Sequence, residues 1–141
     1  MKMNEPIGDA AFGPLLVRLP LGAYFLMAGL AKLDQLAAFI TEIKRFGILP
    51  ENIASLYGSL LPYTEAFVGG ALMLGLWTTL SSSLSSIILL SIIIAYGAFP
   101  HLPGGAGTDV TIFNKDIVLL GMSLSLLFTG CGKYGVDNVK K

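Results

Sequence analysis

Charge is scarce in this chain of 141 residues. Only 13% of the residues are Asp, Glu, Lys or Arg, whereas 54% are hydrophobic, and residues 66–108 contain none of the four charged types. A water-soluble domain of this size could not cover so long an uncharged stretch on every side. A helix that spans a bilayer, in contrast, needs about 20 predominantly apolar residues. The sequence therefore predicts a membrane protein.

Cysteine and histidine are scarcer still, and each absence excludes a kind of chemistry. Cys131 is the single cysteine, so the chain has no internal disulfide and no C-x-x-C redox pair. His101 is the single histidine, which excludes a bis-histidine haem site within one chain. Nine basic residues balance nine acidic ones, so no net field attracts nucleic acid. We expect no metal site and no cofactor held within the chain alone.

The remaining composition favours helices. We expect a single domain over residues 1–141, an all-α integral membrane bundle of four transmembrane helices with a short interfacial helix after the first. Three of the expected spans cover residues 14–33, 80–99 and 115–129. The second span ends near Trp77 and begins either near Ile53, with a kink at Pro62, or at Pro62 itself. The amino terminus lacks the basic region and cleavage site of a secretory signal, so the first apolar segment is expected to stay in place.

Residues 35–48 are too polar to span a bilayer. Their apolar residues share one helical stripe, which is the pattern of a helix lying in the membrane interface: Leu36, Phe39, Ile40, Ile43 and Phe46. Glu42 and Arg45 are expected to face water. Residues 100–114 contain two prolines and three glycines and are predicted to form a loop.

Charged residues inside the apolar segments are the candidate functional residues. An ionised group at mid-membrane costs at least ~2.5–3.5 kcal/mol, so such a group usually serves a site, a partner contact or helix pairing. In the first span, Arg18, Gly22, Gly29 and Lys32 share one helical face, and glycine there lets another backbone approach closely. That face is expected to turn into the bundle.

Glu65 in the second span is expected to face the bundle interior and to pair with a base. If the second helix starts near Ile53, Glu65 lies close to Arg18, which is the partner that we favour. If the helix starts at Pro62, Glu65 lies nearer to Lys32. The sequence therefore leaves both Arg18 and Lys32 as possible partners of Glu65.

Each charged residue also has a simpler interpretation. Arg18, Lys32 and Lys115 could snorkel to the headgroups, and Asp116 could complement a helix dipole at the start of the last span. A carboxylate cannot snorkel far, so Glu65 is the residue for which this alternative is weakest. Arg18, Glu65 and Lys32 are thus the first candidates for a buried charged site, with Lys115 and Asp116 second; no catalytic residue is assigned.

Three blocks of residues resemble those of the DoxX family of small four-helix membrane proteins. The first block is R-x3-G-x6-G-x2-K at residues 18–32, the second is P-x2-E-x3-G-x5-G-L-x-T at residues 62–78, and the third is K-D-x4-G at residues 115–121. A G-x-G at residues 130–132 and Asp137 follow the third block. The loop over residues 100–114 departs from the family in its glycine and proline content.

The resemblance implies a role beside quinone-linked oxidoreductases. On this interpretation the chain is an accessory or quinone-facing subunit in the inner membrane of a prokaryote, with quinone as its cofactor and a membrane or peripheral redox subunit, or further copies of itself, as partners. A buried base would polarise a quinone carbonyl while Glu65 relays a proton. The alternatives are a purely structural subunit and a small oligomeric transporter that uses Glu65 as its proton site. Lysine and arginine counts weakly favour cytoplasmic termini.

Overall fold

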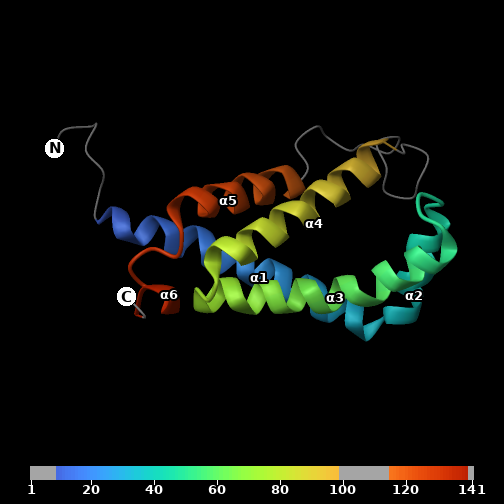
Figure 1. The fold of residues 1–141 in the computed structure, drawn as a ribbon, viewed down its shortest axis with the longest axis horizontal. Coiled ribbons are helices and arrows are strands. Elements are labelled where there is room, and N and C mark those ends of the chain that lie inside the picture. Colours follow the sequence, from blue (N-terminus) through green and yellow to red (C-terminus); the bar gives the residue numbers. More distant parts are fainter. Residues whose placement is uncertain (1–8, 99–114, 140–141) are drawn as a thin grey trace.

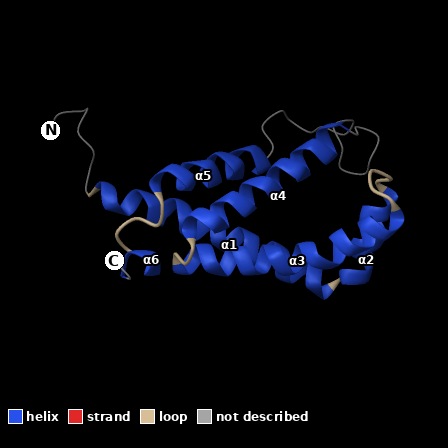
Figure 2. Cartoon of the chain, viewed as in Figure 1, coloured by secondary structure: helices blue, strands red, loops and turns tan. Residues whose placement is uncertain are grey.

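The computed structural model describes residues 9–98 and 115–139, and in these ranges the chain contains helices and loops only (Figure 2). The elements are η1 (Ala10–Phe12), α1 (Gly13–Asp34), α2 (Leu36–Arg45), α3 (Glu51–Leu74), α4 (Thr78–Ala98), α5 (Lys115–Thr129) and α6 (Val136–Val139). The prediction of an all-α fold is confirmed for this part of the chain. The predicted loop over residues 100–114 lies outside the described residues.

Two of the described helices are long and apolar enough to cross a membrane, judged by length and composition. They are the segment Ala10–Asp34, which comprises η1 and α1, and the first 18 residues of α4, Thr78–Ala95. The 15 residues of α5 reach only about 22 Å, which is short of a hydrocarbon core about 30 Å thick. The predicted count of four spanning helices is therefore not confirmed, although the two apolar helices support a membrane protein.

The bundle is built on a close crossing of α1 and α3, with α4 and α5 packed beside each other (Figure 1). Glycines allow the two backbones to touch. A Cβ atom on Gly29 would lie 2.6 Å from the backbone nitrogen of Ala66, and one on Gly69 would collide with the backbone nitrogen of Leu26. The prediction that the glycine face of α1 turns into the bundle is confirmed, because no larger side chain fits at these points.

Serine hydroxyls join α4 to α5. Ser123 of α5 donates a hydrogen bond to the carbonyl oxygen of Ser82 and lies within hydrogen-bonding distance of the hydroxyls of Ser85 and Ser86. Ser82, Ser85 and Ser123 are fully buried. In an apolar bundle these small side chains let the two helices approach closely, and their hydroxyl groups satisfy one another's hydrogen bonds.

Helix α2 extends the bundle beyond the end of α1 and packs on the first half of α3 (Figure 1). Ile43 is buried, Phe39, Ile40 and Phe46 are half-buried, and Glu42 and Arg45 are exposed, as the sequence predicts. The facing residue on α3 is Gly58, where an added Cβ would lie 3.1 Å from Ile40 and 3.2 Å from Ile43. The helix and its amphipathic stripe are confirmed, whereas its place at a membrane interface stays a prediction.

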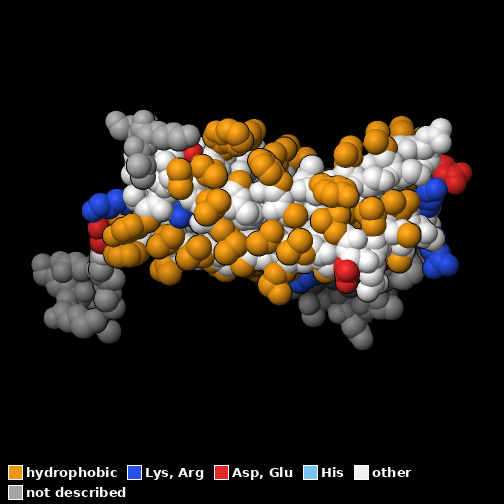
Figure 3. Space-filling model, turned by 90° about the horizontal axis from the view of Figure 1, so that it is seen from below, with side chains coloured by type: hydrophobic (Ala, Val, Ile, Leu, Met, Phe, Trp, Pro, Cys, Tyr) orange, Lys and Arg blue, Asp and Glu red, His pale blue; other side chains and the backbone are white. Residues whose placement is uncertain are grey.

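The first and last described segments meet at the end of the bundle opposite α2. The rings of Phe12 and Tyr134 stack there with their centroids 5.0 Å apart. Hydrophobic side chains cover much of the face seen in Figure 3, while the charged side chains lie mostly toward the two ends of the long axis. This distribution suits a bundle whose long axis crosses an apolar layer.

Candidate functional site

Glu65 forms an ion pair with Lys32. The Lys32 Nζ atom lies 2.6 Å from both carboxylate oxygens of Glu65. Glu65 is almost completely buried, with 2% of its side chain exposed, whereas 26% of the Lys32 side chain is exposed. The predictions that Glu65 faces the interior and has a basic partner are confirmed, but the preference for Arg18 as that partner is wrong.

The path of the chain between α1 and α3 explains this correction. Arg18 would be the partner of Glu65 only if α3 started level with Lys32. Instead α2 lies between the end of α1 and the start of α3 at Glu51 and packs on α3, and Gly29 of α1 meets α3 at Pro62 and Ala66. The carbonyl of Pro62 lies 2.7 Å from the Cβ position of Gly29, which brings Glu65 level with Lys32. Helix α3 (Glu51–Leu74) is continuous through Pro62, so the predicted start near Ile53 is confirmed to within two residues and the alternative start at Pro62 is wrong.

Arg18 lies at the opposite end of α1 and is buried with 2% of its surface exposed. Its guanidinium donates hydrogen bonds to the carbonyl oxygens of Cys131, at 2.8 Å, and Tyr134, at 3.2 Å. It also lies against Gly75, the residue that caps α3. The charge thus sits at the carboxyl-terminal ends of α3 and α5, where the helix dipoles are negative. Arg18 is a buried structural residue here and does not snorkel.

Asp137 completes this end of the bundle, which we call the Arg18 end (Arg18, Gly75, Cys131, Tyr134 and Asp137). Its carboxylate accepts hydrogen bonds from the backbone N–H groups of Trp77 and Thr78, both at 2.8 Å. These are free donors at the start of α4, so Asp137 caps that helix from a distant part of the chain.

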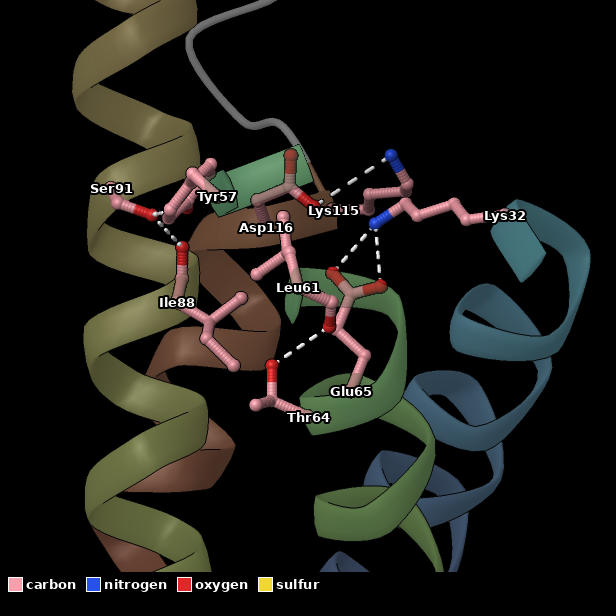
Figure 4. Close-up of polar contacts among 9 residues, drawn as sticks. All are labelled: Lys32, Tyr57, Leu61, Thr64, Glu65, Ile88, Ser91, Lys115 and Asp116. Carbon is pink, nitrogen blue, oxygen red and sulfur yellow. Dashed lines mark hydrogen bonds and ion pairs between the residues drawn. The ribbon is translucent and has the colours of Figure 1, made fainter. Parts of the chain in front are cut away.

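Lys115 and Asp116, the second-tier candidates, lie near Lys32 and Glu65 (Figure 4). Lys115 Nζ is 3.6 Å from a carboxylate oxygen of Asp116. Asp116 is largely buried, whereas Lys115 is exposed. The fold therefore brings four of the five predicted site residues together and leaves Arg18 apart.

A cavity of about 700 Å³ adjoins this cluster, and we call it the Lys32 cavity. Its walls come from α1, α2, α3, α4 and α5. The polar and aromatic lining residues are Tyr24, Lys32, Phe39, Phe46, Tyr57, Ser91, Lys115 and Asp116, and the apolar ones include Ile43, Ile53, Leu61, Ile92 and Ala95. An apolar cavity with a few convergent polar groups is the usual form of a small-molecule site.

Lys32 is the group of the ion pair that reaches this cavity. Its Nζ atom lies 5.2 Å from the centroid of the Phe39 ring, so the ammonium is held between an aromatic face and the Glu65 carboxylate. Glu65 does not line the cavity. A bound molecule would meet the ammonium group, with the carboxylate behind it.

The candidate residues chosen from the sequence do not include Tyr57 and Ser91, whose hydroxyl groups lie 3.1 Å apart across α3 and α4 in the wall of the cavity. One signal was available for Tyr57, because Tyr57, Leu61 and Glu65 are four residues apart and share a helical face. No comparable signal exists for Ser91, since it belongs to another helix whose register depends on packing. Among the described residues no cluster of three His, Cys, Asp or Glu side chains could hold a metal ion.

The fold, the apolar helices and the buried charges define an all-helical membrane protein. The sequence model of one family, described as methylamine utilisation protein MauE, matches residues 10–129. The chain therefore belongs to the MauE family. This finding corrects the assignment to the DoxX family, because the family model that matches the chain is a different one. No curated protein and no solved structure matches the chain significantly.

Proposed function

We propose that this chain is an accessory membrane subunit of a redox system for amine utilisation, and that the Lys32 cavity binds a quinone. The family description supports the first part, because it concerns methylamine utilisation. The observation that carries the second part is the cavity itself, in which the Lys32 ammonium faces an apolar space of about 700 Å³.

The chemistry of the cavity suits a ring with polar oxygens. The Lys32 ammonium has three N–H groups, and the two carboxylate oxygens of Glu65 accept two of them. The third remains for a ligand oxygen, and a hydrogen bond from a charged donor is stronger than a neutral one. Phe39 and Tyr24 offer aromatic faces for the ring, while Ile53 and Ile92 offer apolar surface for a hydrocarbon tail.

Binding of decylubiquinone to the purified protein, measured by calorimetry in detergent micelles, tests this proposal. Lys32→Met alone would leave Glu65 buried without a partner, so the informative variant is the double substitution Lys32→Met with Glu65→Met, which keeps the volume of the pair. We expect its quinone affinity to fall at least about tenfold, the effect of losing one charge-assisted hydrogen bond. Lys133→Met, an exposed residue outside the cavity, is the matched control.

A purely structural role is the second candidate, and the position of the ion pair favours it. The Lys32–Glu65 pair lies next to the crossing at Gly29 and could fix the register of α1 against α3. Unchanged quinone affinity in the double variant, or no binding to the native protein, would favour this role. Proton release from Glu65 on addition of a ligand would instead favour the transporter.

We further propose a four-pass arrangement in the inner membrane of a prokaryote, with both termini in the cytoplasm. The stacked rings of Phe12 and Tyr134 support it, because they bring the two ends of the described chain together. Single cysteines introduced at Glu42 and at Lys133, in a Cys131→Ala background, should react with an impermeant maleimide from opposite sides. Labelling of both from one side would refute the arrangement.

A further inference from the structure

The direction of one hydrogen bond in the Lys32 cavity can be deduced from its neighbour. The Ser91 hydroxyl lies 2.7 Å from the carbonyl oxygen of Ile88, and a carbonyl can only accept. The single proton of Ser91 is therefore used on Ile88. It follows that the Tyr57 hydroxyl donates its own proton to Ser91, across the 3.1 Å that separate them (Figure 4).

Two sides of the same cavity thus offer opposite kinds of hydrogen-bonding capacity. Tyr57 has given away its proton, and its oxygen has lone pairs left, so this side of the cavity accepts. Lys32 has one N–H group left, so its side donates. Figure 4 shows Tyr57 and Ser91 on one side of Leu61 and Lys32 on the other. A ligand that matches both sides carries an acceptor toward Lys32 and a donor toward Tyr57.

A quinone and its quinol differ in this respect. The two carbonyl oxygens of a quinone only accept, whereas each hydroxyl of a quinol both donates and accepts. We propose that the Lys32 cavity binds the quinol form more tightly than the quinone form, because only the quinol supplies a donor to Tyr57. This inference rests on the proposed function and adds the redox state that the site prefers.

The quinone can bind only with a loss at the Tyr57 side. Either its carbonyl faces the Tyr57 oxygen without a hydrogen bond, or the hydroxyl of Tyr57 turns toward the ligand and breaks its bond to Ser91. In both cases the complex with the quinone has one neutral hydrogen bond fewer than the complex with the quinol. This corresponds to about a two- to tenfold lower affinity for the quinone. By linkage, a tenfold preference for the quinol raises the reduction potential of the bound two-electron couple by about 30 mV.

Three ligands test the proposal on the native protein. Decylubiquinone, decylubiquinol under anaerobic conditions, and the dimethyl ether of decylubiquinol have the same ring and tail, but only the quinol has hydroxyl donors. We expect the quinol to bind about two- to tenfold more tightly than the quinone, and the ether to show none of this advantage. Equal binding of quinone and quinol would overturn the inference while leaving the proposed function intact.

Two variants separate a specific hydrogen bond from a general effect of the hydroxyl groups. Tyr57→Phe removes the acceptor, so the affinity for the quinol should fall to that for the quinone. Ser91→Ala frees the proton of Tyr57, so the affinity for the quinone should rise toward that for the quinol. Tyr63→Phe, an exposed tyrosine on the same helix, is the matched control and should preserve the preference.

The outcomes are distinguishable. If none of the three ligands binds the native protein, the proposed function fails and the inference with it. If the ligands bind but the quinol preference survives in Tyr57→Phe, the inference is wrong and quinone binding stands. A lower affinity for the quinone in Ser91→Ala, in place of the expected rise, would also refute it, because it would mean that Ser91 itself holds the ligand.

Discussion

The two ends of α1 each hold a cation, Arg18 buried and Lys32 partly exposed, and they neutralise it in different ways. At the Arg18 end the guanidinium donates hydrogen bonds to two backbone carbonyls in the segment that follows α5, and among the described residues no carboxylate accepts a hydrogen bond from it. At the other end Lys32 meets the carboxylate of Glu65, and its ammonium also lines a cavity of about 700 Å³. Each end contains a buried charged side chain, Arg18 at one and Glu65 at the other, but the cation at the second end also lines the Lys32 cavity.

This difference shows why burial alone does not identify a site. Arg18 is as deeply buried as Glu65, yet the guanidinium is enclosed by Gly75, Gly135 and the carbonyl groups that hold it. Its position is explained by packing and by the helix dipoles. Lys32 retains one N–H group that Glu65 does not accept, and its ammonium faces a volume that a small molecule could fill.

The largest effect is expected at Glu65 and tests which base belongs to it. Glu65→Ala leaves the Lys32 ammonium without its partner and should destabilise the protein by about 3–5 kcal/mol, the usual consequence of breaking a buried pair. Adding Lys32→Ala should recover part of this loss, whereas adding Arg18→Ala should add a further loss. A double-mutant cycle from unfolding in mixed micelles measures both couplings. A coupling free energy between Glu65 and Arg18, with none between Glu65 and Lys32, would contradict the assignment of Lys32 as the partner of Glu65.

The next effect concerns the Arg18 end. Arg18→Met removes the donors to the carbonyls of Cys131 and Tyr134 and should cost about 1–3 kcal/mol, the usual penalty for leaving a buried acceptor unsatisfied. Quinone affinity should not change, because the Lys32 cavity lies elsewhere. Calorimetric titration of this variant checks the second point, and weaker binding would show that the two ends are not independent.

The stability of the fold should be sensitive to a single methyl group added where α1 and α3 cross. A Cβ on Gly69 would collide with the backbone of α1, so Gly69→Ala should destabilise the fold by about 1–3 kcal/mol. Gly70→Ala is the matched control, since nothing lies within 4 Å of its Cβ position and the exchange removes a helical glycine. Equal midpoints of thermal unfolding for the two variants would mean that α1 and α3 do not touch as described.

The smallest effect is expected for the cap on α4. Asp137→Ala removes the acceptor for the N–H groups of Trp77 and Thr78 and should lower the stability by about 1 kcal/mol. Asn138→Ala, the exposed neighbour, is the control. Hydrogen exchange at the start of α4 should increase in the first variant and stay unchanged in the second.

Sequence patterns determined the helical part of this protein. The uncharged stretch and the apolar segments predicted an all-α membrane protein, the stripe on α2 predicted which of its residues are covered, and the glycine spacing predicted the face of α1 that meets another helix. Each of these features depends on periodicity within one segment, which is why it can be deduced without the partner. The assignment to the DoxX family rested on such segment patterns and is wrong, since the family model that matches the chain is that of MauE.

Only the tertiary structure decided which segments face each other. Glu65 pairs with Lys32 and not Arg18 because α2 moves the start of α3 outward, an offset that no pattern within α1 or α3 records. The same holds for Tyr57 and Ser91, whose hydroxyls meet across two helices. Relative height and rotation of neighbouring helices follow from the sum of their side-chain contacts, so the cavity and its donors and acceptors exist only once the helices have packed.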